Sequence, residues 1–194
     1  MHMPRFWIFD MDGTLTIPAH DFAWARQALN IPPEDDILSN VHQRTEPERE
    51  FALKWLMEWE REIAEKAQPQ ADAVALLNHL AERQCTIGIV TRNTKANALI
   101  TLKACGFDGC FEHDDVLGRD DATPKPDPAA LQYLLRRWDA KPQDAIMVGD
   151  YIHDSRAGRA AGTHTVLVMR QGPKPWEHEA DRLVVDLREL ITSP

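Results

Sequence analysis

Short apolar runs recur along the chain, and most of them end at a polar residue or a glycine. The runs are rich in β-branched and aromatic residues and are too short for stable helices, so they predict β-strands. Apolar residues follow one another in most runs instead of alternating with polar ones, which is typical of parallel strands buried on both faces. The predicted strands are residues 5–9, 86–90, 145–148, 165–168 and, with a weaker pattern, 183–185.

Apolar residues at helical spacing lie between these runs. Val74, Leu77 and Leu80, for example, recur every three residues and therefore share one face of a helix. Asp127 precedes Pro128, which predicts a helix capped by the aspartate with proline at its first position. The alternation of strands and helices predicts an α/β fold with a doubly wound parallel sheet, a Rossmann-like core. The predicted helices are residues 71–83, 95–105, 128–138 and 153–161.

The segment of residues 16–68 breaks this alternation, because it contains helical patterns and no convincing strand. Residues 21–29 form one helical pattern, and residues 47–66 form a long amphipathic one. An all-helical insert after the first strand predicts a separate small cap. We therefore expect residues 16–68 to form a helical cap, and residues 1–15 and 69–194 to form the Rossmann-like catalytic core.

Several side chains of this segment invite a functional interpretation, but simpler roles are expected. Trp24, Trp55 and Trp59 are expected to form the core of the cap, and the charges from Glu58 to Glu65 to face solvent. A further set could touch a substrate but is expected to be exposed. It consists of His20, His42, Arg44 and Arg49.

Composition narrows the class of protein. The 194 residues include 22 Lys or Arg and 31 Asp or Glu, giving a net charge of −9, and 43% are hydrophobic. The hydrophobic content is that of an ordinary globular protein and excludes a disordered chain. An acidic chain gains nothing from counterion release on a polyanion, so we expect no nucleic-acid partner. No apolar run approaches the ~20 residues of a membrane span, so no membrane association is expected.

Cysteine usage and the first residues bear on localisation. The three cysteines contain no C-x-x-C pair, which favours a reducing compartment over a disulfide framework. The first strand pattern begins at residue 5 and leaves no room for a signal peptide. We expect a cytoplasmic protein that is a monomer or a weak homodimer.

Polar residues suited to chemistry stand at the ends of the predicted strands or in loops that open helices. In an open α/β sheet, ligands bind at the carboxyl edge of the strands, so these side chains are expected to converge there. They are Asp10, Asp12, Thr91, Lys125, Asp150 and Asp154.

Four carboxylates in one crevice repel each other, and a divalent cation relieves that repulsion. Mg²⁺ prefers oxygen ligands and is commonly bound together with a substrate phosphate. Lys125 adds a positive charge and Thr91 a hydroxyl, which together suit phosphoryl transfer. The chain has no G-x-x-x-x-G-K-[ST] loop, so a P-loop nucleotide hydrolase is excluded. An aspartate nucleophile is the remaining precedent.

The four segments together resemble the motifs of the haloacid dehalogenase superfamily of phosphohydrolases. Asp10-Met11-Asp12-Gly13-Thr14-Leu15 looks like the first motif, and Thr91 fits the second. Lys125 fits the third, and the stretch from Gly149 to Gly158, with Asp150 and Asp154, fits the fourth. Their order and spacing match, and the resemblance covers essentially the whole predicted core.

The resemblance implies a role for each acidic residue. Asp10 would be the nucleophile and a Mg²⁺ ligand. Asp12 would be the general acid/base, with its backbone carbonyl on the metal. Asp150 would be a metal ligand, and Asp154 a direct or water-mediated one. The implied cofactor is Mg²⁺.

The resemblance also implies the residues that bind the phosphoryl group. Thr91 and Lys125 would hold it. Arg92 follows Thr91 where many members have Asn or Ser, and we place this extra cation with the phosphate-binding residues.

The function that these residues favour is a Mg²⁺-dependent phosphatase acting on a small phosphorylated metabolite, similar to the phosphoglycolate-type phosphatases. It would work through an aspartyl-phosphate. A sugar phosphomutase resembling β-phosphoglucomutase uses the same residues with a cap that excludes water, and stays open as an alternative. A non-catalytic interaction module on the same fold is a further alternative, but such a module normally lacks the nucleophile or a metal ligand.

Overall fold

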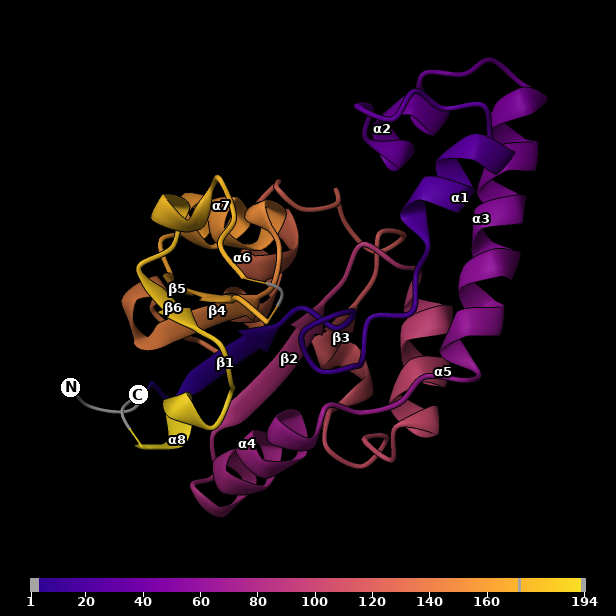
Figure 1. The fold of residues 1–194 in the computed structure, drawn as a ribbon. Coiled ribbons are helices and arrows are strands. Elements are labelled where there is room, and N and C mark those ends of the chain that lie inside the picture. Colours follow the sequence, from indigo (N-terminus) through magenta and orange to yellow (C-terminus); the bar gives the residue numbers. More distant parts are fainter. Residues whose placement is uncertain (1–3, 171, 193–194) are drawn as a thin grey trace.

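Six parallel strands form one sheet in the order β3-β2-β1-β4-β5-β6 (Figure 1). This computed structural model describes residues 4–170 and 172–192. The chain winds outward from β1 to β3 and then restarts beside β1 with β4, so the loops after β1 and β4 adjoin at the carboxyl edge, where ligands bind in such sheets. The strands are β1 (Phe6–Phe9), β2 (Thr86–Val90), β3 (Val116–Leu117), β4 (Ala145–Gly149), β5 (His164–Val168) and β6 (Arg182–Val184).

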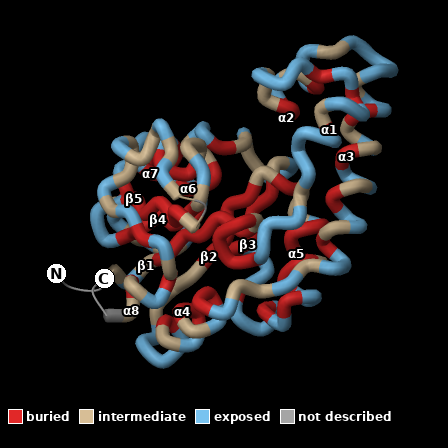
Figure 2. Tube along the Cα trace, viewed as in Figure 1, coloured by how far each residue is buried: buried red, intermediate tan, exposed pale blue. Residues whose placement is uncertain are grey.

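Helices cover both faces of this sheet. Trp7 and Phe9 of β1 pack with α4 and α5 on one face, and Ile8 packs with α6 and α7 on the other. Burial on both faces explains the near-continuous apolar character of the strands (Figure 2). The helices of the core are α4 (Ala71–Glu82), α5 (Lys95–Ala104), α6 (Ala129–Arg137), α7 (Ile152–Ala161) and α8 (Glu189–Thr192), with 3₁₀ turns at His113–Asp115, Pro142–Asp144 and Glu177–Glu179. These features confirm the predicted α/β doubly wound parallel sheet.

Several elements differ from the sequence prediction. The strand β3 was not expected, because two residues are too few to show a period; it is defined by its pairing with Ile89 and Val90 of β2. Helix α6 begins at Ala129 and not at Pro128. Asp127 precedes the helix, and its side chain accepts a hydrogen bond from the Ala129 N–H at 2.9 Å. The helices α2 and α8 were likewise not predicted.

Residues 16–68 leave the core after β1 and return before α4, and the two connections lie side by side. The Ile17 N–H donates to the Gln68 carbonyl and the Gln70 N–H to the Leu15 carbonyl, both at 2.9 Å. We call residues 16–68 the helical insert. Its helices stand apart from the sheet, with α3 alongside α5 (Figure 1). They are α1 (Phe22–Ala28), α2 (Ile37–His42) and α3 (Glu48–Ala64).

The helical insert has a hydrophobic cluster of its own, formed by residues of all three helices such as Ala25, Val41 and Leu56. Trp55 and Trp59 are half-buried against this cluster, but Trp24 is 48% exposed, so its predicted place in the core is wrong. Among the described residues, every helix is too short or too polar to cross a bilayer.

Candidate active site

The carboxyl edge of the sheet brings all six predicted chemical residues to one cavity of about 680 Å³. The loops after β1, β2 and β4 contribute four of them, the first turn of α7 contributes Asp154, and the segment between β3 and α6 contributes Lys125. The helical insert closes the opposite side with residues such as Leu56 and Trp59. The cavity therefore lies between the sheet edge and the insert.

Lys125 lies at the centre of the acidic cluster. Its Nζ is 2.6 Å from Oδ1 of Asp10 and 2.7 Å from Oδ1 of Asp154, and its side chain is 1% exposed. Burial would lower the pKa of Lys125, but the two carboxylates raise it above its usual range. The ammonium group is therefore kept charged beside Asp10.

Three carboxylates lie close together here, and Lys125 contacts two of them, Asp10 and Asp154. One oxygen each of Asp10, Asp150 and Asp154 lies within 4.8 Å of the others. Burial, with repulsion from neighbouring carboxylates, raises the pKa of Asp10 and of Asp150 to about 7 each. Lys125 counteracts this effect at Asp10 without cancelling it. The set is an all-oxygen donor group with excess negative charge, which fits a hard divalent cation such as Mg²⁺.

Two glycines allow the carboxylates to approach this closely. Gly13 has φ +87°, and a Cβ there would lie 2.7 Å from Oδ2 of Asp150. A Cβ on Gly149 would overlap the carboxylate of Asp154. Any larger residue at these positions would push the acidic side chains apart. The close approach of Asp150 and Asp154 therefore requires both glycines.

Asp154 is held by its own helix. It lies in the first turn of α7, as predicted, and its Oδ2 accepts a hydrogen bond from the Tyr151 N–H at 2.9 Å. A carboxylate is favoured at this end of a helix. Gly158, one turn further, lets α7 lie close to the sheet, because a Cβ there would be 2.6 Å from Thr165.

Asp12 has a different environment from the other acids. Its side chain is 26% exposed, and His20 Nδ1 lies 3.9 Å from its Oδ1. Burial raises the pKa of Asp12 to about 6, and Lys125 and a hydrogen bond from Asn93 act against that rise. The group can therefore change protonation state near neutral pH, which general acid/base catalysis requires.

Thr91 is fixed at the end of β2. It is 3% exposed, and its N–H donates to the Leu117 carbonyl of β3 at 3.0 Å. Its hydroxyl accepts a hydrogen bond from the Asn93 N–H at 3.1 Å. The unpredicted strand β3 thus positions a predicted site residue.

Arg92 lines the cavity, but its guanidinium contacts the helical insert. It lies 2.8 Å from Asp36, the residue that caps α2. Burial acts to raise the pKa of Asp36, but hydrogen bonds from Ser39 and Arg92 outweigh it and hold the pKa below its usual range. Phosphate binding by Arg92 stays a prediction.

Glu60 and His20, both in the insert, are less exposed than expected. Glu60 was expected to face solvent, but it is 8% exposed and pairs with Arg119 of the core at 2.7 Å. Burial raises the pKa of Glu60, and Arg119 offsets part of that rise. The sequence contains a signal, because Glu60 follows the buried Ala52 and Leu56 at intervals of four residues.

The expected exposure of His20 is also wrong, since its side chain is only 7% exposed. His20 lines the cavity beside Asp12. The other insert residues that were considered lie elsewhere: His42 is exposed, Arg44 donates to the Leu29 carbonyl, and Arg49 pairs with Glu46.

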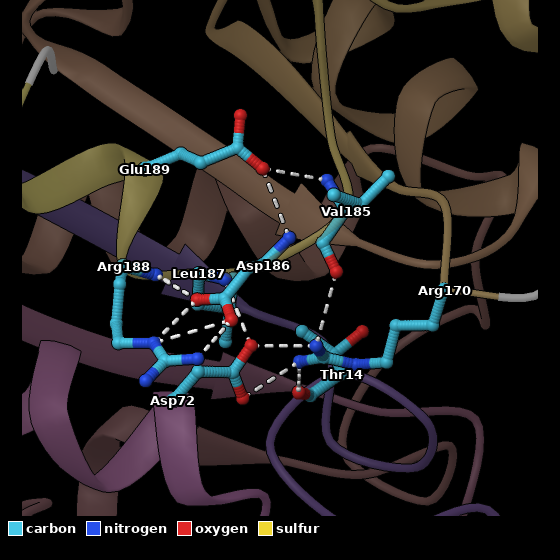
Figure 3. Close-up of polar contacts among 8 residues, drawn as sticks. All are labelled: Thr14, Asp72, Arg170, Val185, Asp186, Leu187, Arg188 and Glu189. Carbon is cyan, nitrogen blue, oxygen red and sulfur yellow. Dashed lines mark hydrogen bonds and ion pairs between the residues drawn. The ribbon is translucent and has the colours of Figure 1, made fainter.

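An ion pair between Arg170 and Asp72 supports the loop after β1, which carries the first motif (Figure 3). Arg170, just after β5, pairs with Asp72 of α4 and also donates to the Thr14 carbonyl at 3.2 Å. Asp72 accepts in addition from the Leu187 N–H at 2.8 Å. These contacts join the loop after β1, the start of α4 and the C-terminal segment.

Comparison with known proteins identifies the family. Residues 7–162 match the family described as haloacid dehalogenase-like hydrolase. An uncharacterised hydrolase of Saccharomyces cerevisiae is 31% identical over 191 residues, which span 95% of this chain and 88% of the yeast protein. A phosphoglycolate phosphatase of Nitrosospira multiformis is 31% identical over 118 residues, 58% of this chain and 51% of that protein. The crystal structure of a hydrolase from Pseudomonas syringae has a TM-score of 0.81 at 24% identity and covers 97% of both chains. The chain therefore belongs to the haloacid dehalogenase-like hydrolases.

Proposed function

We propose that the chain is a Mg²⁺-dependent phosphatase that hydrolyses a small phosphorylated metabolite through an aspartyl-phosphate on Asp10. The observation that carries the proposal is the contact of Asp10 with Lys125 inside a cluster of carboxylates. Membership of a hydrolase family and the likeness to a protein named phosphoglycolate phosphatase support it.

The residues present fit the cation that this reaction needs. Asp10, Asp150 and Asp154 would hold Mg²⁺ through their carboxylates, directly or through water for Asp154, and Asp12 through its backbone carbonyl. Bound Mg²⁺ would supply the positive charge that lets a phosphate dianion approach Asp10.

The side chains divide the remaining work. In our proposal, Asp10 attacks phosphorus while Asp12 gives a proton to the departing ester oxygen. Asp12 then takes a proton from the water that hydrolyses the acyl-phosphate. Thr91, Lys125 and Arg92 hold the phosphoryl oxygens, and Lys125 also balances the charge that develops on them.

We further propose that residues 16–68 act as a cap over a catalytic core of residues 1–15 and 69–194. The paired connections near Leu15 and Gln68 would serve as the hinge. The contacts of Arg119 with Glu60 and of Arg92 with Asp36 would favour the closed form. Closure would exclude bulk water from the reacting phosphate.

A direct test is the release of inorganic phosphate from p-nitrophenyl phosphate and from a panel of phosphorylated metabolites. We expect activity with Mg²⁺, none after EDTA, recovery on Mg²⁺ addition, and less activity with Ca²⁺, whose coordination shell is larger and more flexible. Undiminished turnover in EDTA would refute the mechanism. Conversion of one sugar phosphate into its isomer without phosphate release would favour the phosphomutase instead.

A further inference from the structure

The cavity continues beyond the phosphate-binding end, and aromatic rings of the helical insert line that part. Phe22 and Trp59 both line it, and their rings meet edge to face with centroids 6.1 Å apart. The imidazole of His20 stacks on Phe22 at 5.3 Å. Phe22 is 51% exposed, so one side of this aromatic surface is accessible.

The core contributes a second aromatic group to the same cavity. Tyr151 and Trp176 line it and meet at 5.1 Å between ring centroids. His153 lies next to Tyr151, also at 5.1 Å. Aromatic surfaces on two sides of one cavity suit a ring-bearing ligand, because rings stack on or pack edge-on to aromatic side chains.

We propose, on the basis of the phosphatase function above, that the substrate is a phosphate monoester of a ring-bearing alcohol. Its ring packs against Phe22 and Trp59. Nucleosides and sugars share this chemistry. A cavity of about 680 Å³ accommodates such a leaving group, whereas a two-carbon acid would leave much of it to water.

Kinetics on the full chain test this selectivity. The panel contains two ring-bearing substrates, a nucleoside 5′-monophosphate and a hexose 6-phosphate. They are compared with phosphoglycolate, an ester, and pyrophosphate, an anhydride, neither of which contains a ring. We expect kcat/KM to be at least about tenfold higher for one of the first pair than for either of the second. The ring-bearing substrate with the higher kcat/KM then shows whether the preferred ring is a planar base or a sugar.

Two variants link that preference to the named residues. Phe22→Leu should lower kcat/KM for the preferred substrate roughly fivefold, the size of a lost aromatic contact. Phe51→Leu is its matched control, because Phe51 is 69% exposed on the same insert and does not line the cavity.

Binding separates a failure of this proposal from a failure of the phosphatase function. Calorimetry on the Asp10→Asn protein should give tighter binding of the ring-bearing ester than of phosphoglycolate, and Phe22→Leu in that background should weaken it. This readout needs no turnover. Equal or tighter binding of phosphoglycolate, or an undiminished preference for the ring-bearing ester in the Phe22→Leu protein, would overturn the proposal. If no substrate is turned over but the ligands bind in the predicted order, only the phosphatase function is refuted.

Discussion

Arg92 lies between two possible partners, the phosphoryl group and the helical insert. Its guanidinium contacts Asp36, yet its Nε has no protein partner and the residue lines the cavity. If Arg92 binds phosphate, Arg92→Ala should raise KM for p-nitrophenyl phosphate roughly tenfold, because a hydrogen bond to a charged group is lost.

The matched control is Asp36→Asn, which breaks the ion pair but keeps the cap of α2, since asparagine caps helices as well as aspartate does. We expect a smaller rise in KM for this variant. Equal effects of both substitutions in steady-state kinetics would show that Arg92 acts on the insert alone.

The acidic residues and Lys125 could be predicted to converge because each stands near the end of a strand, and strand ends share one edge of a parallel sheet. Glu60 and His20 were assigned wrongly for the opposite reason. The burial of both depends on how the insert lies against the core. Glu60 is a charged residue on a helix and would be exposed if Arg119 did not cover it.

At the scale of elements, the pair of Asp72 and Arg170 joins α4 to the end of β5 and to the first motif loop. The side chains are 6% and 19% exposed, so removal of one charge leaves the other poorly solvated. Asp72→Ala should lower the free energy of unfolding by about 3 kcal/mol, measured by urea denaturation.

The control for this prediction is an exposed ion pair in the insert. Arg61 and Glu65 are 63% and 52% exposed, so Glu65→Ala should change the free energy of unfolding by less than about 1 kcal/mol. Similar losses in the two variants would mean that the buried pair has no special structural role.

The elements themselves were predictable where they are long or strongly patterned. The strand β2 was predicted at its observed bounds because five apolar or β-branched residues define it without a helical alternative. The helix α2 was missed since its six residues depend on the cap provided by Asp36 and on packing against α3, which no local period reveals. The substrate was out of reach for the same reason, because the cavity is formed jointly by the insert and the core.

For the molecule as a whole, metal binding should stabilise the fold. A cation that binds only the folded state relieves the repulsion among Asp10, Asp150 and Asp154, and adds about 2.7 kcal/mol at a hundred times its Kd. The thermal unfolding midpoint should therefore rise with Mg²⁺ concentration. In Asp150→Asn the midpoint without metal should be higher than in the wild type, because one repelling charge is gone, and its response to Mg²⁺ should be lost. A full response in that variant would place the cation elsewhere.

The identity of the nucleophile can be measured by trapping the covalent intermediate. Asp12→Asn retains the backbone carbonyl but loses proton transfer, worth about 10²- to 10⁴-fold, so hydrolysis of an acyl-phosphate should become slow. A substrate with a good leaving group still permits the first step. The Asp12→Asn protein, quenched during turnover of p-nitrophenyl phosphate and mapped by mass spectrometry, should carry phosphate on Asp10. Phosphate on Asp150 or Asp154, or turnover with no phosphorylated residue, would contradict a mechanism in which Asp10 attacks phosphorus.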